Sequence, residues 1–89
     1  MRQCELCGCW ESFYNPIEKH HVFHGRGIRK LAEKYGMTIH ICHNCHQGPE
    51  GVHNNRDLDV SLKKLYQERF EEEGHSREEF RAIFGKSYL

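Results

Sequence analysis

The sequence lacks the features of a membrane-spanning, secreted or strongly charged protein. No apolar run approaches the roughly 20 residues that cross a bilayer, and no cationic start followed by an apolar stretch marks a secretory signal. The 13 basic and 13 acidic residues balance to a formal net charge of zero, so the field of the whole chain would not steer it strongly toward nucleic acid. We therefore expect a cytoplasmic protein that recognises its partner through local groups.

Apolar residues are also scarce, which limits the core that the chain can build. Only 37% of the 89 residues are hydrophobic, and a single domain of this size buries only about 60 to 65% of the surface of its unfolded chain. A metal or disulfide staple is therefore expected. The five cysteines are odd in number and are accompanied by eight histidines, which favours a metal in a reducing compartment over a disulfide framework.

Two C-x-x-C pairs supply ligands for such a metal. Cys4 and Cys7 form the first pair, and Cys42 and Cys45 form the second. Four thiolates in this arrangement suit a tetrahedral structural Zn²⁺. A redox-active dithiol is the alternative, but a thioredoxin-type motif needs only one pair. Cys9 is interpreted as a spare thiol that could replace Cys7.

Hydrophobic patterning predicts two short strands with a helix between them. A strand around residues 20–23 would carry His20 and His21 on opposite faces. Apolar residues at helical spacing over 28–35 predict a short helix that a glycine ends, and residues 37–41 alternate as a half-exposed strand does. The second strand leads directly into the second cysteine pair.

The remainder of the chain is predicted to be helical. A helix over 57–73 begins at a cap formed by Asp57 or Asp59. A last short helix begins at a capping box that starts with Ser76, and it ends at Gly85. The apolar face of the longer helix is expected to hold Leu58, Ser61, Leu62, Leu65 and Phe70.

No internal repeat or long linker divides the chain. We expect one α+β domain over 1–89, with a zinc-stapled core over about 1–56 and a helical tail over about 57–89. The core carries seven Lys or Arg against five acidic residues, and the tail carries six against eight. The core is therefore mildly basic and the tail mildly acidic.

Seven histidines precede the tail, which is more than one zinc site can use. We expect a second site formed by His20 and His21 on a strand, His46 after the second cysteine pair, and His53 beyond a glycine-rich loop. Histidine titrates near neutral pH and also suits general-base catalysis. The alternative is that these residues are polar loop residues or partial zinc ligands.

Four motifs follow one another along the chain: H-H-V-F-H-G at 20–25, R-K-L-A-E-K-Y-G at 29–36, C-H-N-C-H at 42–46 and G-V-H-N-N at 51–55. In this order they resemble the motifs of short HNH endonucleases encoded by phages and prophages. The resemblance continues through the tail to Leu89 and so covers essentially the whole chain.

The resemblance implies a ββα-metal core, also called a His-Me finger, in which two strands and a helix hold a catalytic divalent cation and the zinc only supports the scaffold. One histidine of the pair His20 and His21 would be the general base and the other would help bind the cation, which His46 and His53 would also hold. The cation would be Mg²⁺, Mn²⁺, Ni²⁺ or another divalent ion. Met37 stands where HNH proteins have their asparagine, and the candidates to replace it are Asn44, Asn54 and Asn55.

These features predict a divalent-metal-dependent DNA endonuclease in the cytoplasm of a bacterial host. Arg26, Arg29 and Lys30 follow the first histidine motif and are candidates to contact phosphates without reading bases, although a solvated helix face would show the same pattern. The alternative function is a noncatalytic zinc-binding module for DNA or protein, which would need the cysteines but not the histidines.

Overall fold

A two-stranded antiparallel sheet organises the first half of the chain. The structure is a computed structural model that describes residues 1–89. Strand β1 (Ile17–His21) pairs with β2 (Thr38–Cys42), so that Ile17 lies opposite Cys42 and His21 opposite Thr38. The α+β class predicted from the sequence is confirmed, because four helices accompany the sheet: α1 (Ile28–Lys34), α2 (His43–Gln47), α3 (Arg56–Glu72) and α4 (Arg77–Phe84).

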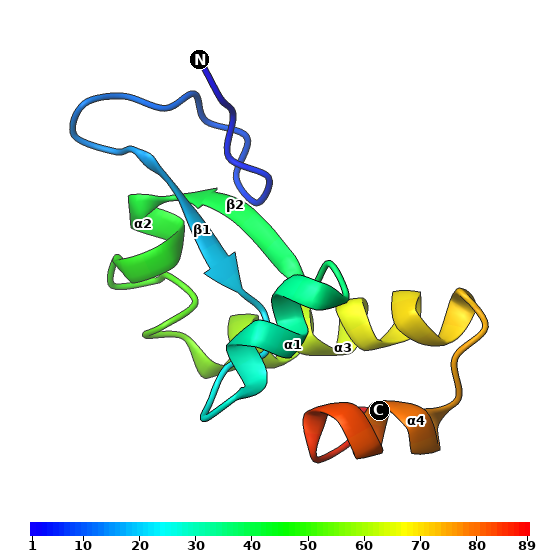
Figure 1. Cartoon of the computed structure of the whole chain (residues 1–89). Helices are drawn as coiled ribbons and strands as arrows, with labels where there is room; N and C mark the ends of the chain where they lie inside the picture. Colours follow the sequence, from blue (N-terminus) through cyan, green and yellow to red (C-terminus); the bar gives the residue numbers. More distant parts are fainter.

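The helices lie at the two ends of the sheet, with α2 at the end of β2 and with α1, α3 and α4 at the opposite end (Figure 1). Helix α1 lies in the connection between the strands and contacts β1 and α4, whereas α2 follows β2 at once and contacts both strands. Helix α4 folds back along α3. The N-terminal segment returns to β2, where the Glu5 N–H donates to the His40 carbonyl oxygen at 3.0 Å. This contact brings the first cysteine pair beside the second.

Strand β1 begins and ends earlier than the strand predicted around 20–23. Val22 and Phe23 are both buried, with exposed fractions of 0% and 2%, and both follow His21, the last residue of β1. The chain leaves the strand here, so that both side chains enter the core, and the Val22 N–H still donates to the Met37 carbonyl oxygen. Ile17, which precedes the predicted range, takes the first position of the strand.

A cluster of phenylalanine rings joins the tail to the first half of the chain. Phe80 of α4 is fully buried, and its ring centroid lies 5.2 Å from that of Phe23 and 5.7 Å from that of Phe70 on α3. Phe84, one turn further along α4, lies 4.9 Å from Phe23. Each buried ring stabilises the fold by about 1.5–3 kcal/mol, so this cluster docks the tail onto the first half of the chain.

The buried face of α3 differs from the predicted face. Leu62, Tyr66 and Phe70 are buried at intervals of four residues, whereas Leu65 is 41% exposed. The prediction was therefore wrong at Leu65, because a spacing of four residues keeps one row of side chains against the core and turns the neighbouring row outward.

Side chains cap both tail helices. Asn55 caps α3 by accepting a backbone N–H at 3.2 Å. The caps predicted for this helix, Asp57 and Asp59, lie within its first turn instead, because the helix already begins at Arg56. Carboxylates in a first turn are favourable to the helix dipole but do not cap it. Ser76 caps α4 as predicted, by accepting a backbone N–H at 3.1 Å.

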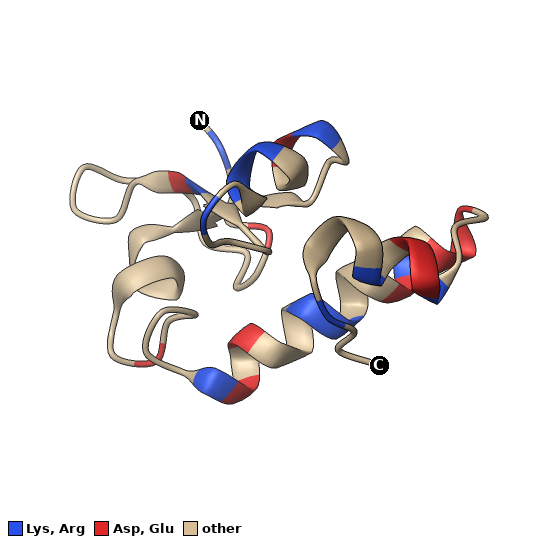
Figure 2. Cartoon of the chain, turned by 60° about the horizontal axis from the view of Figure 1, so that its bottom comes forward, with Lys and Arg blue, Asp and Glu red and all other residues tan.

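Charged residues are distributed unevenly over the helices (Figure 2). Lys and Arg dominate α1, whereas Asp and Glu gather where α3 ends and α4 begins. Helix α1 packs on β1, the strand that carries His20 and His21. None of the four helices has the length and hydropathy that crossing a bilayer requires.

Replacing Phe80 with alanine is expected to lower the free energy of unfolding by about 3–5 kcal/mol, because it removes a buried ring and leaves a cavity. Phe13→Ala is the matched control, since Phe13 is 91% exposed and its truncation should cost less than about 0.5 kcal/mol. Urea denaturation of the two zinc-loaded variants measures the difference. Equal destabilisation would contradict the packing of α4 described above.

Candidate metal sites

The four paired cysteines converge on one point. Cys4, Cys7, Cys42 and Cys45 each offer a sulfur atom, and these atoms all lie within 4.8 Å of one another. The sulfur atoms of Cys7 and Cys42 are 3.8 Å apart. Two sulfur ligands at about 2.3 Å from a tetrahedral zinc would be separated by about 3.8 Å. These four residues, called the cysteine quartet below, are therefore compatible with a structural metal such as zinc.

Backbone N–H groups shape each cysteine pair. The Cys4 sulfur accepts hydrogen bonds from the Leu6 and Cys7 N–H groups, at 3.4 Å each. The Cys42 sulfur accepts one from the Cys45 N–H at 3.4 Å. Gly8 follows the first pair with a φ of 83°, a conformation that side chains disfavour. Donors aimed at a sulfur atom stabilise its thiolate form, which is the form that binds a metal.

The same contacts set the ionisation of the quartet. Burial acts to raise the pKa of Cys4, but backbone donors, led by that of Cys7, outweigh burial and hold the pKa at about 6. Burial also acts to raise the pKa of Cys42, but hydrogen bonds, led by that from the Cys45 backbone N–H, lower it. Cys45 has the opposite shift, since burial and hydrogen bonds to the other thiols raise its pKa. A bound cation would stabilise the thiolate form of this residue.

Cys9 lies beside the quartet but is not one of its members. Its sulfur accepts from the Asn15 side-chain N–H at 3.6 Å. A hydrogen bond to Cys7, followed by burial, raises the pKa of Cys9 to about 12. Cys9 is thus a neutral thiol, and Cys7 is the residue that completes the quartet.

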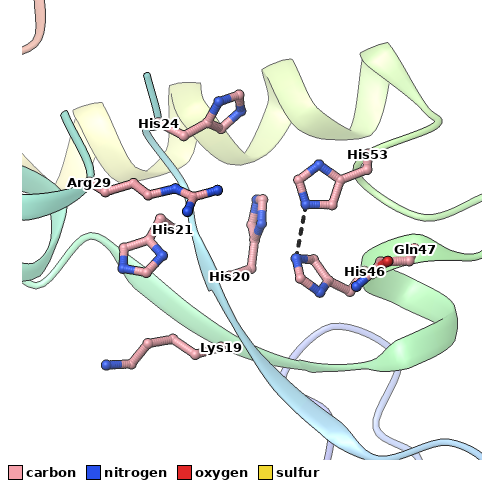
Figure 3. A pocket seen from close by; sticks show the side chains of 8 residues that line it. All are labelled: Lys19, His20, His21, His24, Arg29, His46, Gln47 and His53. Atoms are coloured by element: carbon pink, nitrogen blue, oxygen red, sulfur yellow. Dashed lines mark hydrogen bonds between the residues drawn. The ribbon is translucent and has the colours of Figure 1, made fainter. Parts of the chain in front are cut away.

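Three histidines form a second cluster, called the histidine cluster below. His20 of β1, His46 of α2 and His53 of the loop before α3 each offer a ring nitrogen, and these nitrogens lie within 4.8 Å of one another. The Nε2 atoms of His46 and His53 are 2.9 Å apart. Figure 3 shows the three imidazoles converging from different elements of the chain. The sequence predicted all three of these residues at one site.

Main-chain contacts between α2 and the following loop bring His53 to His46. The His53 N–H donates to the His46 carbonyl oxygen at 3.2 Å. Gly51 permits this approach, because a Cβ at this position would lie 2.7 Å from the Asn44 carbonyl oxygen. The backbone therefore fixes the place of His53 before its imidazole makes any contact.

His20 is the buried member of the histidine cluster. It is 2% exposed, and its Nε2 is buried without a hydrogen-bond partner. Such an orphaned nitrogen costs about 1–3 kcal/mol, which a bound cation would offset. Burial, and then the neighbouring His46 and His53, lower the pKa of His20 to about 4. The ring is therefore neutral at pH 7, and neutral imidazoles are ligands typical of Zn, Cu, Fe and Ni. The residues present thus fit a divalent cation.

Glu18 of β1 contacts two histidines of α2. Its Oε1 lies 2.8 Å from the Nδ1 of His46, and its Oε2 lies 3.0 Å from the Nδ1 of His43. The hydrogen bond with His46 is the largest of the effects that shift the pKa of Glu18, and together they lower it. Glu18 is therefore a carboxylate at pH 7 and accepts hydrogen bonds from α2.

His21 lies apart from the histidine cluster although it follows His20 directly. Its Nε2 is 3.0 Å from the Oε1 of Glu33 on α1, an atom that also accepts from the Lys19 ammonium at 2.8 Å. Lys19, and then His21, lower the pKa of Glu33. The two adjacent histidines of the predicted site thus have different surroundings, His20 among imidazoles and His21 beside a carboxylate.

An open cavity of about 570 Å³ contains these groups, and none of its eight lining residues is apolar. All four histidines of the predicted second site line it. Of the three basic residues that the sequence singled out, Arg29 lines the cavity and reaches into it from α1 (Figure 3). Arg26 and Lys30 do not line it.

Two further lining residues, Lys19 and Gln47, were not predicted, whereas His24 is one of the seven histidines noted before the tail. Lys19 directly precedes His20, and Gln47 directly follows His46. Their position next to predicted site residues was the only signal in the sequence, and it does not reveal which way a side chain points.

The asparagines considered as replacements for the HNH asparagine do not line the cavity. Asn54 donates to the carbonyl oxygens of Gln47 and Gly48 at the end of α2, at 3.2 and 3.0 Å, and Asn55 caps α3. Asn44 is exposed, and Met37 is buried in the core. The cavity is therefore lined by histidines, two basic residues and one glutamine, and by no asparagine.

No protein-family model, curated protein or solved structure matches this chain. The residues of the chain alone therefore indicate what the protein can do. They define a small α+β protein with a cysteine quartet that suits a structural metal and a separate histidine cluster in a polar cavity.

Replacing Cys42 with serine is expected to lower zinc affinity by several orders of magnitude, because zinc binding contributes about 10–16 kcal/mol in small zinc domains. Cys9→Ser is the matched control and should retain the metal. Substitution with Co²⁺ measures both, since the thiolate-to-metal charge-transfer absorption reports only cysteine ligands. Loss of this absorption in Cys9→Ser would mean that Cys9 belongs to the site.

Proposed function

We propose that the protein is a divalent-metal-dependent DNA endonuclease of the HNH type, which hydrolyses phosphodiester bonds. The observation that supports this most directly is the convergence of His20, His46 and His53 in a polar cavity that His21 also lines. The order of elements is consistent with it, since β1, β2 and α2 correspond to the two strands and the helix of a ββα-metal core. The roles proposed below follow from the contacts of each residue.

The histidine cluster would hold the cation. The Nε2 atom of His20 has no hydrogen-bond partner, and His46 and His53 direct their Nε2 atoms at each other. When bound, a divalent cation here supplies positive charge to the phosphate and to the leaving 3′ oxygen. Mg²⁺, Mn²⁺ and Ni²⁺ are the candidates, and three nitrogen ligands favour a transition metal over Mg²⁺, which prefers oxygen.

His21 would act as the general base. The Glu33 carboxylate engages its Nε2, and because a carboxylate only accepts hydrogen bonds, the proton of His21 lies on Nε2 and the lone pair on Nδ1. At Nδ1, His21 would take a proton from the water molecule that attacks phosphorus. His20 is less suited to this role, because it is buried and its free nitrogen belongs to the histidine cluster.

Arg29 would hold the phosphate backbone of the DNA. It lines the cavity together with His24 and Lys19, and a guanidinium donates several hydrogen bonds to phosphate oxygens in a fixed geometry. Lys19 is already paired with Glu33 at 2.8 Å, so Arg29 is the principal candidate. Contacts of this kind position DNA without selecting a base sequence.

The cysteine quartet would support the site without taking part in the chemistry. Cys42 ends β2, and Cys45 directly precedes His46 on α2. A structural zinc at the quartet would therefore fix the junction of β2 and α2. This junction sets the distance between His46 and His20, which lies on the paired strand β1.

Zinc-loaded protein is expected to nick supercoiled plasmid DNA when Mg²⁺, Mn²⁺ or Ni²⁺ is added, and EDTA should abolish the nicking. His21→Ala should lower the rate by about 10²- to 10⁴-fold, which is the typical contribution of a general base. Gel electrophoresis measures the conversion of supercoiled plasmid to the open-circular form.

The matched control is His75→Ala, because His75 pairs with Glu79 and does not line the cavity. This variant should nick at the wild-type rate. Undiminished nicking by a folded His21→Ala protein would refute its role as the base. DNA binding without nicking, in every cation tested, would favour the noncatalytic zinc-binding module instead.

Arg29→Ala is expected to weaken DNA binding and to reduce the slope of log affinity against log salt concentration by about one, because one phosphate contact is lost. Arg26→Ala is the control, since Arg26 is exposed and lies outside the cavity lining, and it should change the slope less. Fluorescence anisotropy of a labelled duplex measures both slopes. Equal changes would mean that the cavity is not where phosphate is held.

A further inference from the structure

Glu18 occupies a place from which one side chain can orient the histidine cluster. It lies on β1 two residues before His20, so both side chains project from the same face of the strand. Its two carboxylate oxygens contact the Nδ1 atoms of His46 and His43 on α2, at 2.8 and 3.0 Å. The contact with His46 is the only hydrogen bond between a carboxylate and a member of the histidine cluster.

This contact decides which nitrogen of His46 faces the cluster. A carboxylate can only accept, so His46 must carry its proton on Nδ1. A neutral imidazole with its proton there has its lone pair on Nε2, the atom that lies 2.9 Å from the Nε2 of His53. The other tautomer would point an N–H group into the cluster and would prevent His46 from binding a cation.

We infer that Glu18 is the positioning residue of the histidine metal site, and that it holds His46 in the tautomer and orientation that bind the cation. This inference rests on the cation site of the proposed function. A carboxylate behind a metal-binding histidine fixes its ring and makes it a stronger ligand, and its loss lowers metal affinity about 10- to 100-fold in typical sites. Glu18 acts only through His46.

Other contacts in the same region distinguish this role from simple attachment of α2 to β1. His43 also contacts Glu18 and ties α2 to the strand, but it is not a member of the histidine cluster. Glu33 makes the same kind of contact with His21, which is likewise outside the cluster. Both contacts can be removed without changing the tautomer of a cluster histidine.

The test compares the cation affinity of Glu18→Gln with that of His43→Gln, Glu33→Gln and the wild type. Each full-length protein carries zinc in the cysteine quartet and is titrated with Co²⁺, whose visible absorption reports binding without any turnover. Glu18→Gln should bind Co²⁺ about 10- to 100-fold more weakly than the wild type, whereas the two control variants should bind it as the wild type does. Circular dichroism verifies that each variant is folded.

The tautomer of His46 provides a second readout, which a general loosening of α2 would not produce. In ¹⁵N-labelled, zinc-loaded protein without added Co²⁺, long-range ¹H–¹⁵N correlations should place the His46 proton on Nδ1 in the wild type. In Glu18→Gln the signals should shift toward the Nε2-protonated form, because the carboxylate that held the proton on Nδ1 is gone.

Two results would overturn the inference, and they have different consequences for the proposed function. Wild-type Co²⁺ affinity or an unchanged His46 tautomer in Glu18→Gln would mean that Glu18 only links α2 to β1, and the proposed function would stand. Failure of the wild-type protein to bind any cation beyond the quartet zinc would remove the histidine metal site, and with it both the inference and the cation site of the proposed function.

Discussion

Four converging sulfur atoms join two parts of the chain that are distant in sequence, and the rest of the structure depends on this junction. Cys7 and Cys42 are 35 residues apart, and their sulfur atoms are 3.8 Å apart. The phenylalanine cluster that fills the other end of the core comes largely from α3 and α4. Only 37% of the residues are hydrophobic. Apolar packing therefore stabilises one end of the core, and the cysteine quartet with its sulfur ligands lies at the other end.

The geometry of the histidine cluster depends on that junction. His20 is placed by the pairing of β1 with β2, and His46 by a helix that starts at a cysteine of the quartet. His53 is placed by a loop that lies against the same helix. Each of the three imidazoles is thus held by a different main-chain constraint, and side-chain contacts such as that of Glu18 only adjust the rings. Because a separate main-chain constraint holds each imidazole, the cluster can form from residues that lie on three different elements.

Features encoded within a few residues were predictable from the sequence, and features that depend on packing were not. The cysteine pairs and the Ser76 cap are local patterns, and the structure contains both. The contact between His21 and Glu33 depends on how α1 packs on β1, and the exposure of Leu65 depends on which side of α3 meets the core. Helix α2 was interpreted only as a cysteine pair, because five residues carry too little periodicity to predict a helix.

The route by which His53 reaches its neighbours determines how the cation preference of the proposed histidine metal site would evolve. Its position comes from a backbone hydrogen bond and from the close approach of Gly51, and neither depends on the imidazole. A single codon change at position 53 could therefore exchange one donor atom while the fold and the other two donors stay in place. An aspartate there would turn an all-nitrogen set into a mixed nitrogen and oxygen set, which suits harder ions. Selection for a different available metal would then act on one residue and leave the rest of the scaffold intact.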